Sequence, residues 1–435
     1  MKIIKLFLLL ALQQFAPSLQ SQFLSNLRAV KTDALFTTYA APPERSHYKT
    51  DQGYQFQWTD DEAGVEFVSK EGPNLGIAFQ FGKRLVFRLQ ELYREPVVTA
   101  SYSDLVKYFY YPQQDLRVEM FVAVYSSETA ILQCRLINEG SFPVTVSALP
   151  YLYYPSSDSS LKIEHQDYTD GYTFPLWKKR DGWMVEHHIP VVENLTGSFQ
   201  STLDFDSVST FLLQTNKNHP VPKSGTLAGF KQSIASQKRN TPFINGIIGF
   251  RTFTLQPGES TKFNITINLC EANIREPETP LSQGRGVGGE ALPAGELTSR
   301  LPVRGGGGDL LKNLLQSSEQ AYAKIPKLNF TDKDKEMLYW SSFSLMRQCM
   351  MPPEGECRHN YYVFSREPRW GWGYGGQVFH ESLVMMAYAY MDPLGAMNSQ
   401  QVYMDRQQPD GYINYRTGPY LNETIETNGK PTSSA

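Results

Sequence analysis

Short runs that alternate between apolar and polar residues, or are continuously apolar, fill the chain from about residue 50 to 270. Clear examples are 117–124 and 130–137. Gly, Pro, Asn and Asp separate these runs, as in the Pro-Gly turn at 257–258, and no helical periodicity lies between them. Many short strands without interleaved helices predict an antiparallel β-sandwich over residues 25–275.

The pattern becomes helical after residue 308, and Leu, Gln, Ala and Lys are prominent over 309–325. Thr331 can cap a second helix. Asp392, followed by Pro at the first helical position, predicts the start of another helix that continues to about residue 408. Between them, apolar residues at helical spacing predict a helix over 377–391. We expect three of its side chains to anchor it in a core, namely Phe379, Leu383 and Met386.

Residues 276–308 separate the two patterns and are rich in Pro and Gly. This composition predicts an exposed linker or an irregular insertion. A formal G-x-G-x-x-G occurs at Gly284, Gly286 and Gly289, but Pro residues lie both before and after it. A strand before it and a helix after it, which a dinucleotide site needs, are therefore not expected. We expect no cofactor.

The helical segment covers 309–435, and its few helices cannot bury all of their apolar stripes against one another. We therefore expect a multidomain β and α protein, of which this sequence is the N-terminal part.

The first 21 residues have the pattern of an export signal. Lys2 and Lys5 precede an apolar run at 6–12, and cleavage is expected near Ser21. The run is far shorter than the roughly 20 apolar residues that span a membrane, and no later stretch reaches that length. We expect a secreted, periplasmic or secretory-pathway protein with no membrane span.

The net charge of −3 and the lack of a long basic run make nucleic-acid binding unexpected. Export permits disulfides, and Cys349 and Cys357 flank a loop that contains Pro and Gly, so a disulfide between them is predicted. For Cys134 and Cys270, a disulfide and two buried thiols both remain open. The oligomeric state does not follow from the sequence.

The segment with the most candidate chemistry begins with R-W-G-W-G-Y-G-G at 369–376, which holds two of the six Trp residues. Glycines between aromatic residues leave the rings uncovered, and a flat exposed ring can stack on the apolar face of a sugar. The alternative is ordinary packing of the Trp rings in a core. We interpret this segment as an aromatic loop that binds carbohydrate.

Polar residues follow the aromatic loop in two groups, and with the rings they make up the candidate substrate-binding set. The members are Trp370, Trp372, Tyr374, Gln377, His380, Glu381, Arg406, Gln407, Tyr412, Asn414 and Arg416. His380 and Glu381 are adjacent, so on a helix their side chains diverge and this spacing does not predict a metal site. Gly-x-Ser-x-Gly, the motif of a serine hydrolase, is absent from the sequence.

Glycoside hydrolysis requires two carboxylic acids at a separation that the stereochemistry fixes. Asp392 is better explained as a helix cap, and Asp410 as a turn residue before Gly411. Glu381 is the stronger candidate because it begins a helix beside the aromatic loop. The catalytic residues nevertheless stay unassigned.

Two stretches resemble the six-hairpin glycosidases, above all glycoside hydrolase family 63 and the mannosylglycerate hydrolase-like group. They are REPRWGWGYGGQVFHES at 366–382 and DRQQPDGYINYRTGPY at 405–420. The resemblance implies an N-terminal β-sandwich packed on an (α/α)6 barrel, with 309–435 as the first helices of an incomplete barrel. It also implies hydrolysis of α-linked glucosides or related oligosaccharides with inversion.

This sequence departs from the family in two ways. Many relatives have Trp-Asp in the early aromatic loop, where this chain has Trp372-Gly-Tyr374. The family's acid and base come from later barrel segments, so by the resemblance both lie beyond Ala435 and this chain alone is expected to be inactive. Two alternatives stay open. One is a non-catalytic carbohydrate-binding protein, and the other is a polysaccharide lyase, for which Asn414, Tyr415 and Arg416 are compatible residues.

Overall fold

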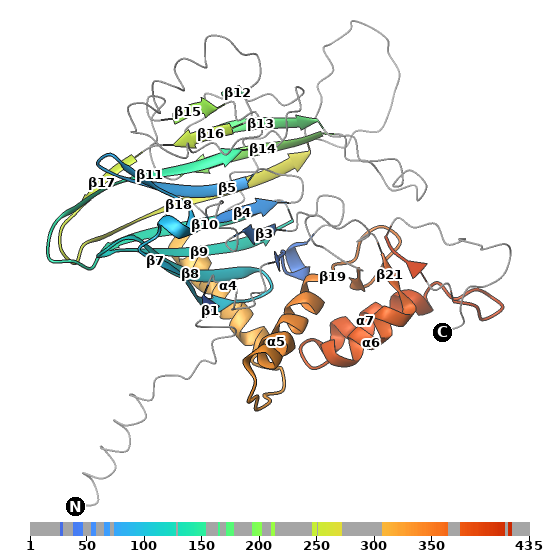
Figure 1. Cartoon of the computed structure of the whole chain (residues 1–435). Helices are drawn as coiled ribbons and strands as arrows, with labels where there is room; N and C mark the ends of the chain where they lie inside the picture. The colour runs from blue at the N-terminus through green and yellow to red at the C-terminus, as the bar shows by residue number, and fades with distance from the viewer. Residues whose placement is uncertain are drawn as a thin grey trace, which may run out of the picture.

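The structure is a computed structural model of the 435-residue chain, shown in Figure 1. It describes residues 27–28, 38–46, 54–57, 65–69, 74–127, 129–153, 164–165, 171–177, 194–201, 210–213, 246–249, 251–271, 307–363, 375–413 and 416–419.

Two nine-stranded sheets form a β-sandwich, as predicted (Figure 1). The first sheet has the order β1 (Leu27–Arg28), β7 (Arg94–Ser101), β8 (Leu105–Gln113), β9 (Leu116–Ser126), β10 (Thr129–Asn138), β18 (Ser260–Glu271), β14 (Asn194–Ser201), β13 (Gly171–Trp177) and β12 (Glu164–His165). The second has the order β15 (Thr210–Leu213), β16 (Gly246–Gly249), β11 (Val144–Tyr153), β5 (Asn74–Phe81), β4 (Glu66–Ser69), β3 (Tyr54–Gln57) and β2 (Thr38–Tyr39), with β17 (Arg251–Leu255) beside β11 and β6 (Arg84–Val86) beside β5. The strand pairs within both sheets are antiparallel.

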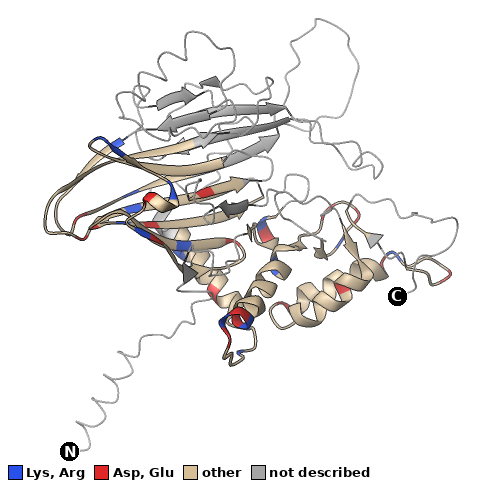
Figure 2. Cartoon of the chain, in the orientation of Figure 1, with Lys and Arg blue, Asp and Glu red and all other residues tan. Residues whose placement is uncertain are grey.

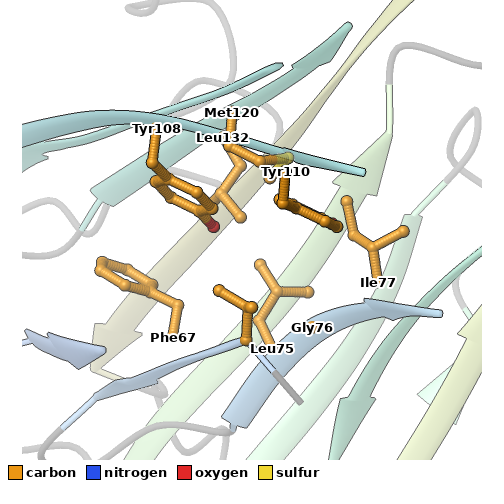
Figure 3. Close-up of a pocket in the computed structure, with 9 residues that line it drawn as sticks. Phe67, Leu75, Gly76, Ile77, Tyr108, Tyr110, Met120 and Leu132 are labelled. Atoms are coloured by element: carbon orange, nitrogen blue, oxygen red, sulfur yellow. The ribbon is translucent and has the colours of Figure 1, made fainter. Parts of the chain in front are cut away.

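Alternation along the strands builds the core between the sheets. On β8, Tyr108 and Tyr110 face inward, and on β5 Leu75 and Ile77 meet them from the other sheet (Figure 3). These residues and their neighbours enclose a cavity of about 10 Å³, which has room for about one water. Around these residues the interior of the sandwich is therefore a packed core.

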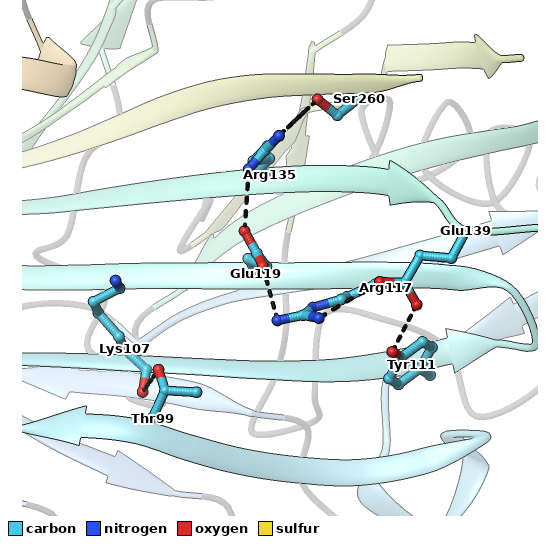
Figure 4. Close-up of polar contacts among 8 residues, drawn as sticks. All are labelled: Thr99, Lys107, Tyr111, Arg117, Glu119, Arg135, Glu139 and Ser260. Atoms are coloured by element: carbon cyan, nitrogen blue, oxygen red, sulfur yellow. Dashed lines mark hydrogen bonds and ion pairs between the residues drawn. The ribbon is translucent and has the colours of Figure 1, made fainter. Parts of the chain in front are cut away.

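Charged side chains cover the outer face of the first sheet in a row across neighbouring strands (Figure 4). Arg117 lies 2.9 Å from Glu119 and 3.5 Å from Glu139, and Arg135 lies 3.5 Å from Glu119 on its other side. Exposed pairs of this kind each contribute about 0–1 kcal/mol. The row keeps one face of an antiparallel sheet in contact with water.

The helical segment contains α4 (Gly307–Tyr322), α5 (Lys333–Gln348), α6 (Val378–Tyr388) and α7 (Pro393–Met404), and two short 3-10 helices, η1 (Pro43–Arg45) and η2 (Leu89–Glu91), lie in the sandwich. Asp392 caps α7 as predicted, and its carboxylate accepts from the Gly395 N–H at 2.9 Å. The predicted cap of α5 is wrong by one residue, because Asp332 and not Thr331 accepts from the first-turn N–H groups. No helix in the described part of the chain is long and apolar enough to cross a membrane.

Within this chain, the face of α6 that was expected to anchor the helix is exposed. Phe379, Leu383 and Met386 are 69%, 50% and 67% exposed, whereas Met385 and Tyr388 are buried. Apolar residues surround most of α6, so their spacing alone does not select the face that packs. On α7, Leu394, Met397 and Met404 are also exposed. Figure 2 shows how few charges these two helices carry: α6 has Glu381 as its one Asp, Glu, Lys or Arg, and α7 has none.

A second core joins the helices to the sandwich. Ala123 and Ile131 of the first sheet belong to it together with Leu311 and Leu314 of α4 and Phe343 of α5. The outer face of the first sheet is therefore apolar where α4 lies and charged around Arg117, Glu119 and Arg135. This division fixes which part of the sheet the helices cover.

Buried hydrogen bonds set the position of the helices on the sandwich. Asp104, 3% exposed in the β7–β8 turn, accepts from the Ser318 hydroxyl of α4 at 2.8 Å. The Tyr322 hydroxyl accepts from the Ser103 N–H at 3.0 Å, and the Gln348 amide donates to the carbonyl oxygens of Ser103 at 3.1 Å and Thr38 at 2.6 Å. We call this set the polar junction.

Arg347, 8% exposed, supplies the positive charge of the polar junction. Burial raises the pKa of Asp104, and the Arg347 guanidinium opposes that rise. Asp104 is also the residue that most strongly favours the charged form of Arg347. Each of these two buried charges therefore depends on the other.

Replacing Asp104 with Ala should lower the free energy of unfolding by about 3–5 kcal/mol, because Arg347 stays buried without the carboxylate that most favours its charged form. Urea unfolding of the whole chain measures this loss. Glu119→Gln, which breaks the exposed row, is the control and should lower it by about 0–1 kcal/mol. Equal effects of the two substitutions would contradict the importance of the polar junction.

Candidate functional site

The two stretches that carry the family resemblance meet at one end of the α6–α7 pair. There β21 (Gly376–Gln377), at the start of α6, pairs with β22 (Arg416–Thr417), which follows α7. A second short sheet lies nearby, in which β19 (Met350–Met351) pairs with β20 (Tyr361–Tyr362). We call the region around these two sheets the α6–α7 end.

Gly376 brings three segments into close contact at this end. A Cβ atom at this position would lie 2.7 Å from the Tyr362 carbonyl oxygen and 2.7 Å from the Tyr403 Oη atom. Gly376 is therefore required for β21 to pack between β20 and α7. The next residue, Gln377, is the N-cap of α6, and its half-buried side chain makes no capping hydrogen bond.

Arg406 joins the end of α7 to β22. Its Nη1 atom donates to the Thr417 hydroxyl and, at 3.2 Å, to the Gly418 carbonyl oxygen. The side chain that was expected to bind substrate therefore has partners within the protein. It links the helix to the short sheet that contains Gln377.

Gln407 and Tyr412 belong to the turn after α7. The Gln407 amide donates to the Gly411 carbonyl oxygen at 2.9 Å, and the Asp410 carboxylate accepts from the Tyr412 N–H at 3.0 Å. Gly411 has a φ of 90°, which favours glycine. The contacts of Gln407 thus stabilise the turn, and the half-buried Tyr412 comes directly after it.

Glu381 is buried, with 2% of its surface exposed. Burial raises its pKa to about 7, and a hydrogen bond from the Ser399 hydroxyl of α7 opposes the rise. Burial also raises the pKa values of Tyr362 and Tyr403, and Glu381 adds to both effects. The carboxyl therefore lies among hydroxyl groups inside the α6–α7 end and does not face solvent. His380 is half-buried, and its ring lies 5.6 Å from the Phe379 ring.

A cluster of polar side chains, which the sequence did not predict as a group, lies at the same end. His359 Nε2 lies 3.1 Å from Asp405 Oδ2, and the Gln401 amide donates to Asp405 Oδ1 at 2.6 Å. The Asn398 amide donates to Asn360 Oδ1 at 3.2 Å. Only the i, i+4 spacing of Gln401 and Asp405 could have indicated part of this cluster. Amide, imidazole and carboxylate groups together can bind the hydroxyls of a sugar.

Four of the candidate residues, Trp370, Trp372, Tyr374 and Asn414, lie outside the described residues, and Arg416 is described in its backbone only. The segment with the three aromatic rings connects β20 to β21 along the chain. Both of its ends therefore belong to the α6–α7 end, and the roles of these residues stay predictions.

The structure does not form the predicted disulfide. Cys349 and Cys357 are both buried, and no disulfide joins them. Backbone pairing closes the loop instead, since the Cys357 N–H donates to the Glu354 carbonyl oxygen at 3.0 Å and β19 pairs with β20. Burial raises the pKa of the Cys357 thiol to about 12.

Comparisons with known proteins give loose structural similarities. No family model matches the sequence, and no curated protein matches it. A protein described as a kojibiose phosphorylase from the human microbiome has a TM-score of 0.48 and 10% identity, covering 93% of this chain and 50% of its own. A GH92 family glycosyl hydrolase has a TM-score of 0.37 and 8% identity, covering 84% of this chain and 47% of its own. A polysaccharide lyase has a TM-score of 0.28 and 12% identity over 55% of this chain and 33% of its own.

The chain spans about half the length of the first of these proteins. None of the three is described as a family 63 enzyme. All three TM-scores are below 0.5.

Replacing Gly376 with Ala should lower the free energy of unfolding by about 1–3 kcal/mol, because the added methyl group meets Tyr362 and Tyr403. Thermal or urea unfolding measures the loss. Tyr403→Phe removes the hydroxyl group that the added methyl group would meet. Within the described residues, the Tyr403 hydroxyl has no hydrogen-bond partner, so its removal should cost little. The double variant should therefore regain part of the stability. A Gly376→Ala variant as stable as the original would contradict this packing.

Proposed function

We propose that this chain acts in an exported glycoside hydrolase that cleaves α-linked glucosides or related oligosaccharides with inversion. The pairing of β21 with β22 carries the proposal. It brings residues 376–377 of one family-like stretch against 416–417 of the other, although about 40 positions separate them. Two stretches that resemble one family's binding loops therefore share one site.

The order of the domains supports the same proposal. The antiparallel sandwich precedes the helices, and the polar junction packs them on its first sheet. The resemblance implies this order for a sandwich followed by an (α/α)6 barrel. We infer that α4 to α7 are the first helices of such a barrel.

The exposed side chains of α6 and α7 agree with an incomplete barrel. Phe379, Met386, Leu394 and Met397 are each more than 60% exposed on helices with very few charges. Apolar faces of this kind are usually covered in a complete domain. Further barrel helices would cover them.

The residues of the α6–α7 end would bind the sugar and leave the proton transfers to other groups. The Trp370 and Trp372 rings would stack on the sugar, and Gln377 and the His359–Asp405 pair would bind its hydroxyls. An inverting reaction also needs one carboxylic acid to protonate the leaving oxygen and one carboxylate to activate water. We assign neither role to a residue of this chain.

Trp372→Ala should weaken the binding of maltotriose or isomaltotriose to the chain by about 1–3 kcal/mol, with little change in melting temperature, because a stacking ring is lost. Isothermal titration calorimetry measures the affinity, with the β-linked cellotriose as a control ligand. Trp340→Ala is the matched control variant, since Trp340 packs against the second core. It should lower stability and leave the affinity of the folded protein unchanged.

Three results would count against the proposal. A Trp372→Ala variant that is strongly destabilised, by about 3–5 kcal/mol, and binds normally when folded would make this ring a wedge between the sandwich and the helices. If the original chain bound neither maltotriose nor isomaltotriose, the proposed carbohydrate site itself would be refuted. Binding in a complete protein that never hydrolyses these sugars would favour the non-catalytic alternative.

A further inference from the structure

Glu381 links α6 to α7 inside the α6–α7 end. It lies in the first turn of α6, and the fully buried Ser399 of α7 is hydrogen-bonded to its carboxyl group. The Ser399 hydroxyl oxygen accepts from the Tyr362 N–H at 3.2 Å. Its single proton is therefore available for the hydrogen bond to the Glu381 carboxyl.

The surroundings of Glu381 suit a neutral carboxyl group better than a charged one. Within the described residues, its Oε1 atom has no hydrogen-bond partner. A buried carboxylate normally needs several donors or a cation. Ser399 supplies one donor, which leaves half of the carboxyl group without compensation if it is ionised.

Titratable and charged groups approach Glu381 or its immediate neighbours from each element packed on this part of α6. The groups near Glu381 itself are Tyr403 and Arg406 from α7 and its end, Tyr362, Cys349 and Cys357 around the β19–β20 hairpin, and the adjacent His380 on α6. Those beside Tyr388 include Arg347 from α5 and Asp392 at the start of α7. Arg406 is bonded to β22, and Arg347 acts on Asp104. The pKa of Glu381 is set by burial and by the Ser399 bond, and not by either cation.

We propose that Glu381 is a positioning residue that carries a proton in the folded protein and, through Ser399, holds the start of α6 and Gln377 against α7. The neutral carboxyl allows the two helices to pack without a buried negative charge. Ionisation would draw water or a cation into the contact and loosen β21, which Gly376 packs against Tyr362 and Tyr403. The effect on sugar binding rests on the proposed function, whereas the bound proton does not.

The direction of the pH effect is set by the difference between the two states. In the unfolded chain a Glu ionises near pH 4.3, whereas the folded carboxyl keeps its proton until about pH 7. The folded state therefore binds the proton more tightly between these values. Stability should fall as the pH rises through this window and then become constant.

The test compares the melting temperature of the full chain with that of Glu381→Gln from pH 5 to 8. Gln has the shape of the protonated side chain and cannot ionise. The original protein should lose about 5 °C relative to the variant over this range. Glu336→Gln is the matched control, because Glu336 occupies the same first-turn position of α5 but is exposed. It should behave like the original protein.

Ser399→Ala gives a second readout that does not depend on the Gln variant folding. The Ser399 bond favours the charged form of Glu381, so its loss should move the midpoint of the pH transition upward. Parallel pH profiles for the original protein and Glu381→Gln, or an unchanged midpoint in Ser399→Ala, would overturn the proposal.

Maltotriose affinity, measured over the same pH range, separates the two proposals. It should fall above pH 7 in the original protein and stay constant in Glu381→Gln. Affinity that falls equally in both would refute the positioning role. A stability difference without any binding of maltotriose or isomaltotriose would refute the proposed function and leave the bound proton established.

Discussion

The buried carboxylate of Asp104 determines where the helices lie. It projects from the β7–β8 turn of the first sheet, accepts from Ser318 of α4 and balances Arg347 of α5. A buried charge tolerates few arrangements, because both its counter-charge and its hydrogen bonds must be in place. Apolar contacts between the sheet and α4 favour packing without fixing its direction. The polar junction therefore selects one orientation of α4 and α5 on the sandwich.

The orientation of α4 and α5 in turn positions the α6–α7 end. The last residues of α5 lead directly into β19, and β19 pairs with β20, whose Tyr362 contacts both Gly376 and Ser399. Gly376 and Gln377 then pair with β22, so the two family-like stretches come together on a support that starts at the sandwich. Three features have different roles along this path: two opposite buried charges at the polar junction, the close packing of Gly376 at β21 and the buried carboxyl group of Glu381.

Much of the fold, but less of the site, could be predicted from the sequence. Alternation predicted the antiparallel sandwich, because strands of one sheet must turn one face to the core. Local chemistry also predicted the Asp392 cap, whereas Thr331 and Asp332 can both cap and only the folded geometry chooses. The buried face of α6 could not be read from an almost uniformly apolar helix. Pairs such as His359–Asp405 and Gly376–Tyr403 were missed because they join distant positions.

The central claim is that the α6–α7 end is the carbohydrate site of this chain. Hydrogen exchange of the full chain, with and without saturating maltotriose, tests it most directly, because backbone protection maps the contact without any substitution. The account predicts slower exchange in 376–381 and 405–418, with the strands of the first sheet unchanged. Protection confined to the outer face of that sheet, around Arg117 and Glu119, would contradict it and place sugar binding on the sandwich.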